Sequence, residues 1–263
     1  MENLKILLLA ITQGVSELIP VSSSAHLILL GRLINIPVST LMLTTLQIGT
    51  SIAIIVFFRH ELFDNLFSKR KLNLYLKMLI SIIPIGVIGI LYEHKVEEVL
   101  RFNWIIAVSL IFWGIVMILV DLFKKNTPQK KIENITLKNS IIIGLSQILA
   151  LIPGTSRSGI AILAGIATGF DKYSALEYSL ILGVPILIGS SLWEIIRSVF
   201  IQNNDFSYYS DPSSFIKLGI IFIVPFIVGS LSLIVLSKIK KEKWLLTFGI
   251  YRIVLGVLIL LFL

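Results

Sequence analysis

Apolar residues run in long blocks along this chain, and polar residues gather between the blocks. Six blocks are long enough to cross the hydrocarbon core of a bilayer, which needs about 20 apolar residues. Three of them contain a proline, which is tolerated where neighbouring helices satisfy the carbonyl groups that a proline leaves free. We predict six transmembrane helices, at Thr40–Phe58, Lys77–Tyr92, Asn103–Phe123, Ser174–Ile196, Phe215–Leu236 and Leu245–Leu263.

Two further apolar regions are each broken by a segment rich in hydroxyl groups. Leu4–Ile34 is interrupted by Pro20-Val-Ser-Ser-Ser-Ala-His26, and Ile141–Phe170 is interrupted by Pro153-Gly-Thr-Ser-Arg-Ser-Gly159. The apolar pieces that follow the interruptions span only about 12–17 Å as helices, which is too short to cross a bilayer. We therefore predict two re-entrant helical hairpins, each with its polar tip buried in protein at membrane depth.

The two interrupted regions resemble each other in sequence. Gly14-Val-Ser-Glu17 recurs as Gly144-Leu-Ser-Gln147, and Pro20-Val-Ser-Ser23 recurs as Pro153-Gly-Thr-Ser156. Three predicted spans follow each region, and because three is odd, the second half must be inserted upside down relative to the first. Inverted repeats of this kind bring interrupted helices together near the bilayer midplane, where substrates bind.

The predicted fold class is therefore an all-α polytopic membrane protein. It has six transmembrane helices plus two re-entrant helical hairpins in an inverted-topology repeat. We expect a single integral membrane domain over residues 1–263, with inverted repeats at roughly 1–123 and 138–263. The first hairpin would enter from outside and the second from the cytoplasm, so that the two tips meet.

Composition supports a membrane protein and argues against a nucleic-acid role. Of the 263 residues, 56% are hydrophobic and 14% are charged, whereas soluble domains carry about 25% charged residues. The net charge is +8, but the basic residues stand in short clusters between apolar blocks, which is typical of cytoplasmic membrane loops. The chain has no cysteine, so disulfides and thiolate chemistry are excluded.

Charge also predicts the orientation in the membrane. With six spans and two hairpins, two acidic loops fall on the side of the membrane opposite to every basic cluster. One loop contains Glu93, Glu97 and Glu98, and the other contains Asp205 and Asp211. The positive-inside rule then places both termini outside. The basic clusters are Arg59, Lys69, Arg70, Lys71 and Lys77, then Lys124, Lys125, Lys130, Lys131 and Lys138, then Lys238, Lys240, Lys241 and Lys243.

The second tip carries the groups of an anion site. Arg157 offers a planar fork that suits phosphate oxygens, and the helix that begins near Ile160 offers free N–H groups. The alternative is a capped helix whose arginine pairs with a buried carboxylate. The hydroxyl groups and glycines around Arg157 that we assign to substrate binding are Thr155, Ser156, Ser158 and Gly154, with Gly159 allowing close backbone approach.

The first tip carries three serines, Ser22, Ser23 and Ser24, and a histidine, His26, again at a helix start. Gln13 and Glu17 precede them and are four residues apart, hence on one helix face. Their oxygens are suited to a hard divalent cation that is completed by water and phosphate. Alternatively, Gln13 only bonds a neighbouring helix and Glu17 only pairs with Arg157. Three residues from Ser23, His26 is a candidate acid, base or nucleophile.

Other charged residues lie within or near the predicted spans. For Glu177, Glu194 and Arg252 we expect pairing between helices rather than contact with a substrate.

At these residues the chain resembles the bacterial undecaprenyl-diphosphate phosphatase family of the bacitracin-resistance type, over nearly its whole length. The resemblance rests on the two tip motifs and on the later segments Ala175-Leu-Glu-Tyr-Ser179 and Ile250-Tyr-Arg252. It implies a hydrolase that converts undecaprenyl (polyprenyl) diphosphate to the monophosphate and so recycles the lipid carrier for cell-wall synthesis. It also implies a multi-pass protein of the bacterial inner membrane whose active site faces the extracytoplasmic side.

The resemblance further implies dependence on a divalent cation, Mg²⁺ or Ca²⁺, and matches Glu17, Ser23, His26 and Arg157 to essential positions. Gln13 stands where many relatives have a second glutamate, which weakens a two-carboxylate metal site. Ser24-Ala25 stands where relatives often have Thr-Gly, a change that the backbone can absorb. The expected partners are the lipid substrate and the bilayer, with a homodimer as one assembly and no nucleic acid.

Three schemes are open for the chemistry: Ser23 attacks with His26 as its base, His26 attacks directly, or His26 activates water. We favour Ser23. A function of a different class, a transporter or flippase for a lipid-linked phosphate or small anion, fits inverted repeats equally well. The combination of serine, histidine, glutamate and arginine favours the enzyme, since transport needs no nucleophile.

Overall fold

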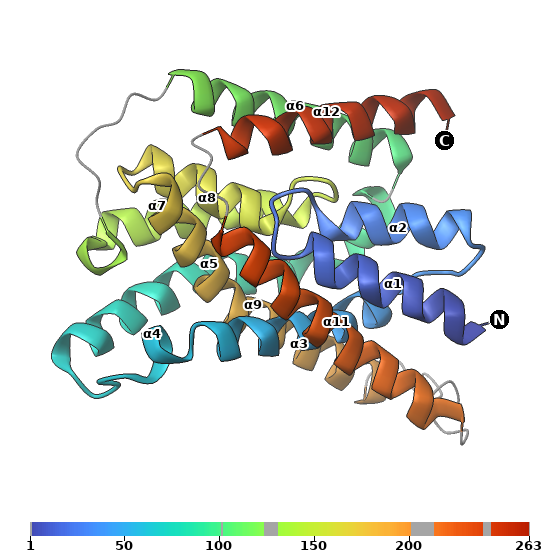
Figure 1. The fold of residues 1–263 in the computed structure, drawn as a ribbon, viewed down its shortest axis with the longest axis horizontal. Helices are drawn as coiled ribbons and strands as arrows, with labels where there is room; N and C mark the ends of the chain where they lie inside the picture. Colours follow the sequence, from blue (N-terminus) through green and yellow to red (C-terminus); the bar gives the residue numbers. More distant parts are fainter. Residues whose placement is uncertain (1, 101, 124–130, 201–212, 239–242, 263) are drawn as a thin grey trace. The chain divides into compact units, whose positions relative to one another are not determined.

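The computed structural model describes residues 2–100, 102–123, 131–200, 213–238 and 243–262, which form helices and turns without a strand (Figure 1). The predicted all-helical fold class is confirmed for this part of the chain. The elements are α1 (Glu2–Ser16), α2 (Ser23–Leu33), α3 (Thr40–Phe57), α4 (Arg59–Phe63), α5 (Lys69–Leu100), α6 (Asn103–Phe123), η1 (Ile132–Asn134), α7 (Leu137–Gln147), η2 (Ile148–Leu151), α8 (Arg157–Ala167), α9 (Lys172–Phe200), α11 (Ser213–Ser237) and α12 (Trp244–Phe262).

Among these elements, six helices are long and apolar enough to cross a membrane: α3, α5, α6, α9, α11 and α12. The six predicted spans are confirmed, and α6 has the predicted bounds. The acidic loop predicted after Tyr92 is wrong, because α5 continues to Leu100. Residues 93–98 include no glycine or proline, and charged residues such as glutamate and lysine favour a helix even where they end an apolar run.

Some residues of the orientation prediction lie outside the described part of the chain. These are the basic residues Lys124, Lys125, Lys130, Lys240 and Lys241 and the acidic residues Asp205 and Asp211.

The two interrupted regions fold as pairs of short helices. α1 has 15 residues and packs against α2, which has 11. Likewise α7 and α8 have 11 residues each and pack against one another. A helix of 11 residues is about 16 Å long, so the predicted short pieces are present.

By their contacts the residues form two compact units, each drawn from both halves of the chain. The first contains Met1–Leu18, Ser23–Arg59 and Gly183–Lys238. Within it α1 packs against α2 and α11, and α11 packs against α3. The crossing of α1 with α11 needs a glycine, since a Cβ at Gly14 would lie 2.7 Å from Val228 Cβ.

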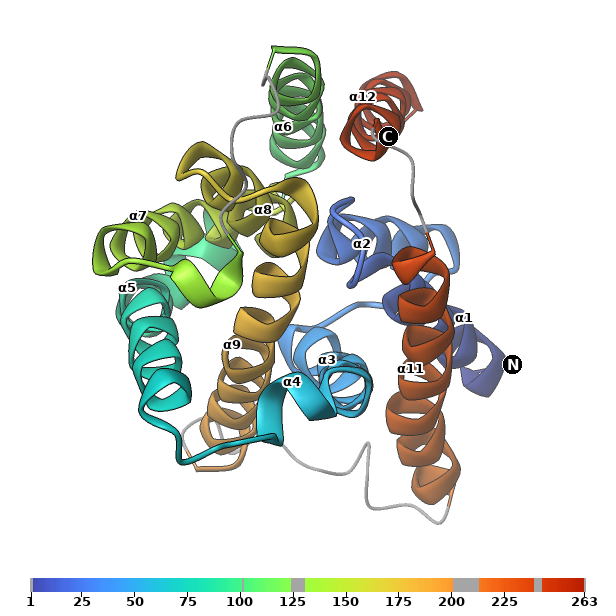
Figure 2. The ribbon, with the colours of Figure 1, turned by 60° about the vertical axis from the view of Figure 1, so that its left-hand side comes forward.

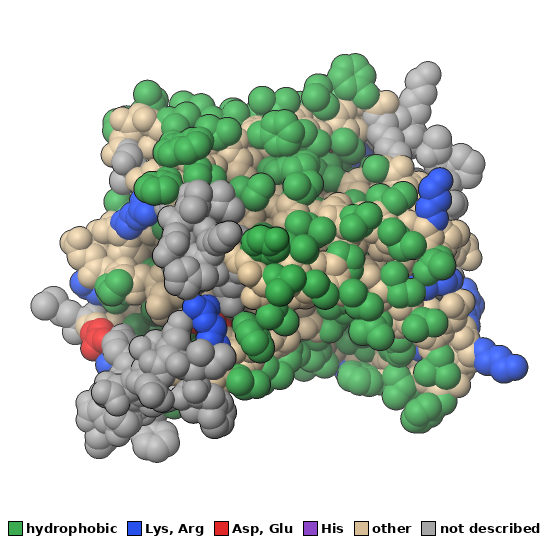
Figure 3. Space-filling model, turned by 180° about the vertical axis from the view of Figure 1, so that it is seen from behind, with side chains coloured by type: hydrophobic (Ala, Val, Ile, Leu, Met, Phe, Trp, Pro, Cys, Tyr) green, Lys and Arg blue, Asp and Glu red, His purple; other side chains and the backbone are tan. Residues whose placement is uncertain are grey.

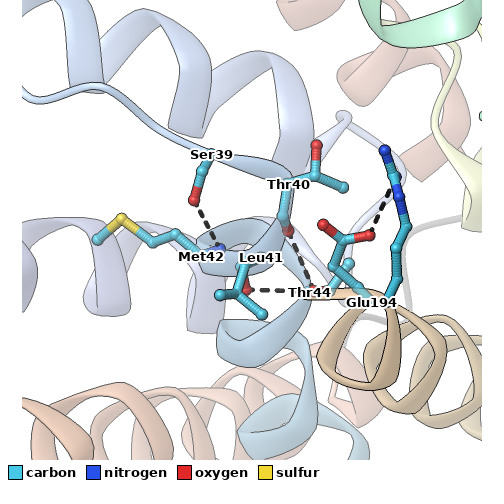
Figure 4. A network of polar contacts seen from close by, with 7 residues as sticks. Ser39, Thr40, Leu41, Met42, Thr44 and Glu194 are labelled. Carbon is cyan, nitrogen blue, oxygen red and sulfur yellow. Dashed lines mark hydrogen bonds and ion pairs between the residues drawn. The ribbon is translucent and has the colours of Figure 1, made fainter. Parts of the chain in front are cut away.

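Figure 4 shows polar contacts at the start of α3 and beside Glu194 of α9, inside the first unit. Ser39 caps α3, its hydroxyl accepting a bond from the Met42 N–H at 3.2 Å, and Ser191 of α9 donates to the Thr44 carbonyl of α3 at 2.6 Å. Glu194 is buried and accepts a bond from Arg197 of the same helix at 3.4 Å. This contact lies within α9, and the pairing between helices that we expected for Glu194 stays a prediction.

The second unit contains Ile19–Ser22, His60–Leu182 and Ile239–Leu263. Within it α7 packs against α5 and α8, and α6 lies beside α12 along their length (Figures 1 and 2). A glycine again marks a crossing, because a Cβ at Gly144 would lie 2.9 Å from the backbone of Ser81 in α5. The Ser81 hydroxyl donates to the Ser140 carbonyl of α7 at 2.9 Å.

A buried carboxylate joins three helices of the second unit. The side chain of Asp121, at the end of α6, is fully buried and pairs with Lys172 of α9. Its other oxygen accepts a bond from the Leu246 N–H at 2.8 Å. Asp121 thereby satisfies an N–H of the first turn of α12, which has no partner within its own helix.

The surface of the described residues suits lipid. Large apolar side chains are exposed on the spanning helices, among them Trp104, Phe112, Ile223 and Leu258. Hydrophobic side chains predominate on the face seen in Figure 3. Because soluble proteins rarely expose contiguous apolar surface on this scale, the protein is a multi-pass membrane protein.

Replacing Asp121 tests this junction. Asp121→Ala leaves Lys172 and the Leu246 N–H without their carboxylate, so we expect a loss of about 1–3 kcal/mol of stability and a lower midpoint of thermal unfolding in detergent. Asp64→Ala is the matched control, because Asp64 pairs with His60 at the surface, where ion pairs contribute little. Equal midpoints for the two variants would contradict the role given to Asp121.

Candidate active site at two helix starts

Both short second helices begin directly after a serine in an unusual backbone conformation. Ser22 precedes α2 with φ of 72°, and Ser156 precedes α8 with φ of 73°. A positive φ strains a residue other than glycine by about 1–3 kcal/mol and is concentrated at functional sites. The backbone conformation therefore pairs Ser156 with Ser22, whereas the sequence repeat had paired Ser156 with Ser23. With this shift of one residue, Arg157 occupies the position in α8 that Ser23 occupies in α2.

In the first unit, the predicted residues before and after the turn are in contact. The Ser23 hydroxyl donates to Oε2 of Glu17 at 2.5 Å, and Nε2 of Gln13 donates to the same oxygen at 3.2 Å. Glu17 is 6% exposed and Gln13 is fully buried, while Ser23, Ser24 and His26 are half-buried. A carboxylate that holds a serine proton is a ready base for that serine.

The donor set of a divalent cation is present in part. Oε1 of Gln13 is buried and has no hydrogen-bond partner within the described part of the chain, while Nε2 of the same residue donates to Glu17. Carboxylate and amide oxygens are the ligands that hard cations prefer. In the described part of the chain no three His, Cys, Asp or Glu residues come together as a metal cluster. These residues fit a cation only if phosphate and water complete its shell.

In the second unit, Arg157 is the first residue of α8 and is half-buried. Its Nη1 donates to the Ser179 carbonyl at 3.2 Å, and the Ser179 hydroxyl donates to the Ser158 carbonyl at 3.1 Å. Ser156 caps the helix by accepting a bond from the Gly159 N–H at 3.1 Å. The start of α8 is thus braced against α9, which fixes the guanidinium beside a helix N-terminus.

The remaining residues assigned to the second tip are packed against α6. Thr155 is buried, and its hydroxyl lies 3.0 Å from the Ser109 hydroxyl. Gly154 has φ of 91°, and a Cβ there would lie 2.6 Å from the Ile106 carbonyl oxygen, so only glycine fits. For these two residues the contacts shown are structural, and their predicted contact with substrate stays a prediction.

Arg252 of α12 is the residue whose role the sequence did not indicate. It is fully buried, and its Nη1 donates to the Pro20 carbonyl at 3.1 Å. Its Nη2 donates to the carbonyls of Gly154 at 2.6 Å and Thr155 at 2.9 Å. We expected Arg252 to pair between helices; instead it binds backbone carbonyls of both polar turns. The sequence offered two signals at this residue, the charge of an arginine within an apolar span and the segment Ile250-Tyr-Arg252 in the family resemblance, and neither indicated these partners.

The segment Ala175-Leu-Glu-Tyr-Ser179 also has a structural explanation. Tyr178 is buried, and its hydroxyl lies 3.1 Å from the Ser81 hydroxyl in α5. Ser179 holds Arg157 and α8, as described above. This part of α9 therefore positions the second motif.

The predicted site residues are distributed over both units. Gln13, Glu17, Ser23, Ser24 and His26 belong to the first. The second holds Ser22, Gly154, Thr155, Ser156, Arg157 and Ser158. The turn residues Ile19–Ser22 belong to the second unit as well, where Arg252 binds Pro20.

Comparison with known proteins extends over almost the entire chain. The model of the family described as bacitracin resistance protein BacA matches residues 6–258. Undecaprenyl-diphosphatase 1 of Clostridioides difficile is 34% identical over 270 residues, with 99% of this chain and 96% of that protein covered. An undecaprenyl-diphosphatase of Campylobacter jejuni is 36% identical, with 97% and 92% covered, and one of Methanococcus aeolicus is 31% identical, with 100% and 99% covered.

Removal of the Arg252 guanidinium tests its role at the two turns. Arg252→Met leaves three buried carbonyls without these donors, so we expect a stability loss of about 3 kcal/mol or more and a much lower thermal midpoint. Arg252→Lys keeps the charge but cannot reproduce the planar fork, and it should be intermediate. Val254→Ala, on an exposed position of the same helix, is the control. A wild-type midpoint for Arg252→Met would refute the bracing role.

Proposed function

This chain belongs to the bacitracin resistance protein BacA family, and on that premise we propose that it hydrolyses undecaprenyl diphosphate to undecaprenyl phosphate. Two relatives that are named undecaprenyl-diphosphatase cover 99% and 97% of the chain. The observation in this protein that carries the proposal is the contact between the Ser23 hydroxyl and the Glu17 carboxylate. The monophosphate returns as lipid carrier to cell-wall synthesis, which connects the activity to resistance against bacitracin.

In the proposed first step, the Ser23 oxygen attacks the terminal phosphorus. Its proton passes to Glu17, which already accepts a bond from that hydroxyl. The bond between the terminal phosphorus and the bridging oxygen breaks, and the electron pair stays on the bridging oxygen of the departing lipid monophosphate. Glu17 rather than His26 is then the base for Ser23, because the contact supports Glu17.

In the second step, water attacks the phosphorus of the phosphoserine, the bond between Ser23 Oγ and phosphorus breaks, and inorganic phosphate is released. Glu17 returns its proton to the Ser23 oxygen. We assign His26 to take the proton of that water, because it lies three residues after Ser23 in α2, hence near it on the helix surface. Histidine is suited to this role, since its ordinary pKa lies near neutral pH. Ser22 and Ser24 would contribute hydrogen bonds to the phosphate oxygens.

The second motif would bind and stabilise charge rather than transfer protons. We propose that Arg157, with the N–H groups at the start of α8 and the hydroxyls of Ser156 and Ser158, holds the diphosphate of the same lipid molecule. Preorganised donors of this kind are worth most where water is excluded. Arg252 holds the carbonyls of Pro20, Gly154 and Thr155 within the second unit, which supports a fixed conformation of the turn before Arg157.

A divalent cation, Mg²⁺ or Ca²⁺, completes the proposed site. Glu17 and Oε1 of Gln13 would hold it together with the diphosphate and water. The cation would neutralise phosphate oxygens during the reaction.

For the membrane arrangement we propose the inverted repeat with two re-entrant hairpins, both termini outside and the site open to the extracytoplasmic side of the inner membrane. Two pairs of matching features support the inverted repeat. The helix α1 crosses α11 at Gly14 as α7 crosses α5 at Gly144, and the backbones of Ser22 and Ser156 have the same conformation. The prenyl tail would lie along the apolar spans, and a homodimer is compatible with this arrangement.

Glu17→Gln removes both the base and the only carboxylate of the proposed cation site. We expect phosphate release from polyprenyl diphosphate by the purified protein to fall at least a hundredfold, with normal membrane insertion. Gln13→Glu is the paired variant: it adds a carboxylate, so activity should persist and less magnesium should be needed. An unchanged rate and unchanged sensitivity to chelators in Glu17→Gln would exclude both roles.

The nucleophile can be identified by trapping. Rapid quenching during turnover should yield a phosphoserine at Ser23, which survives acid, whereas a phosphohistidine at His26 survives alkali and is lost in acid. Ser23→Ala should lower turnover by more than a hundredfold, since no attacking group remains. An alanine variant that keeps over a tenth of the wild-type turnover would rule out Ser23 as the nucleophile.

A further inference from the structure

The buried amide of Gln147 takes no part in the steps proposed for Ser23, Glu17 and His26. Gln147 is the last residue of α7, and its side chain is fully buried. Both polar atoms of the amide, Nε2 and Oε1, lack a hydrogen-bond partner among the residues that the structure describes. Burying an amide without partners is costly, so a residue of this kind needs an explanation.

Its neighbours on the buried face of α7 do not share this condition. Asn139 donates to the Thr168 carbonyl at 3.0 Å, and its oxygen accepts a bond from the Thr136 N–H at 3.0 Å. Ser140 donates to the Thr136 carbonyl at 3.2 Å. Asn139 and Ser140, on the same buried face, therefore have hydrogen-bond partners. A general tolerance for buried polar groups on this face does not explain the unsatisfied amide of Gln147.

The position of Gln147 in the fold matches that of Glu17. Each residue stands three places after a glycine that allows a close helix crossing, Gly14 in α1 and Gly144 in α7. Each stands where the first helix of its pair ends, because α1 ends at Ser16 and α7 ends at Gln147. In the first motif this position carries the carboxylate that contacts Ser23.

We propose that Gln147 is a substrate-contacting residue of the second motif. Its Nε2 donates to a phosphate oxygen of the lipid diphosphate, and its Oε1 accepts a bond from water that accompanies the phosphate. A neutral amide suits this position, because a second carboxylate in the motif of Arg157 would repel the anion and compete for the guanidinium. This inference rests on the proposed function and adds a binding residue to it.

Gln147→Met tests the proposal, because methionine has a similar length but no hydrogen-bonding group. We expect KM for polyprenyl diphosphate to rise at least tenfold while the thermal midpoint stays equal or rises, since an unsatisfied buried amide has been removed. Gln147→Glu keeps the shape and adds charge, so its KM should rise further. Trp244→Phe is the matched control: it removes another buried N–H without a partner and should leave KM unchanged.

A second measurement separates this inference from the hydrolase itself. The wild-type protein should be stabilised against heat by a methylene-bridged, non-hydrolysable lipid diphosphate, and Gln147→Met should lose most of that shift. A wild-type KM and a full shift in Gln147→Met would overturn the inference while leaving the hydrolase intact. Absence of phosphate release by the wild-type protein would instead refute the proposed function. In that case the change in thermal midpoint on adding the analogue would still decide whether Gln147 binds a diphosphate.

Discussion

The structure depends on satisfying peptide groups at two breaks in its helices. In an apolar protein within lipid, a helix that stops leaves carbonyl and N–H groups that water cannot reach. Arg252 satisfies several of these groups, because its buried guanidinium donates hydrogen bonds to the carbonyls of Pro20, Gly154 and Thr155. The charge of Arg252 is in turn stabilised by the carbonyl dipoles that it binds. A hydrophobic residue at position 252 would leave the carbonyls of Pro20, Gly154 and Thr155 without these donors.

The same breaks set the conformation of the two polar motifs. A continuous helix would consume the N–H groups at the starts of α2 and α8 and would carry Ser23 and Arg157 on ordinary helical faces. The strained serines before these helices instead turn the chain so that α2 begins at Ser23 and α8 begins at Arg157. Strain and unsatisfied polar atoms, such as Oε1 of Gln13, lower stability and are retained where function requires them.

Much of the fold could be predicted from the sequence, because lipid imposes a length on every apolar helix. The bounds of α6 agree with the prediction to the residue, whereas α5 extends beyond its predicted bounds. Charged residues end the apolar stretch of α5, but they do not end the helix. The functional residue types were also recognisable in the two motifs. Their contacts were not: Arg252 and Pro20 are joined across most of the chain, and no local pattern indicates such a partner. The contact of Ser23 with Glu17 likewise depends on the turn between them.

The central claim is that this protein breaks the diphosphate of its lipid rather than carrying the intact lipid across the membrane. The most direct test is product analysis in proteoliposomes that contain polyprenyl diphosphate and magnesium. Our account predicts one inorganic phosphate for each lipid monophosphate formed, with the phosphate released on the side where the termini lie. Movement of intact lipid diphosphate between leaflets, with no phosphate released, would contradict it.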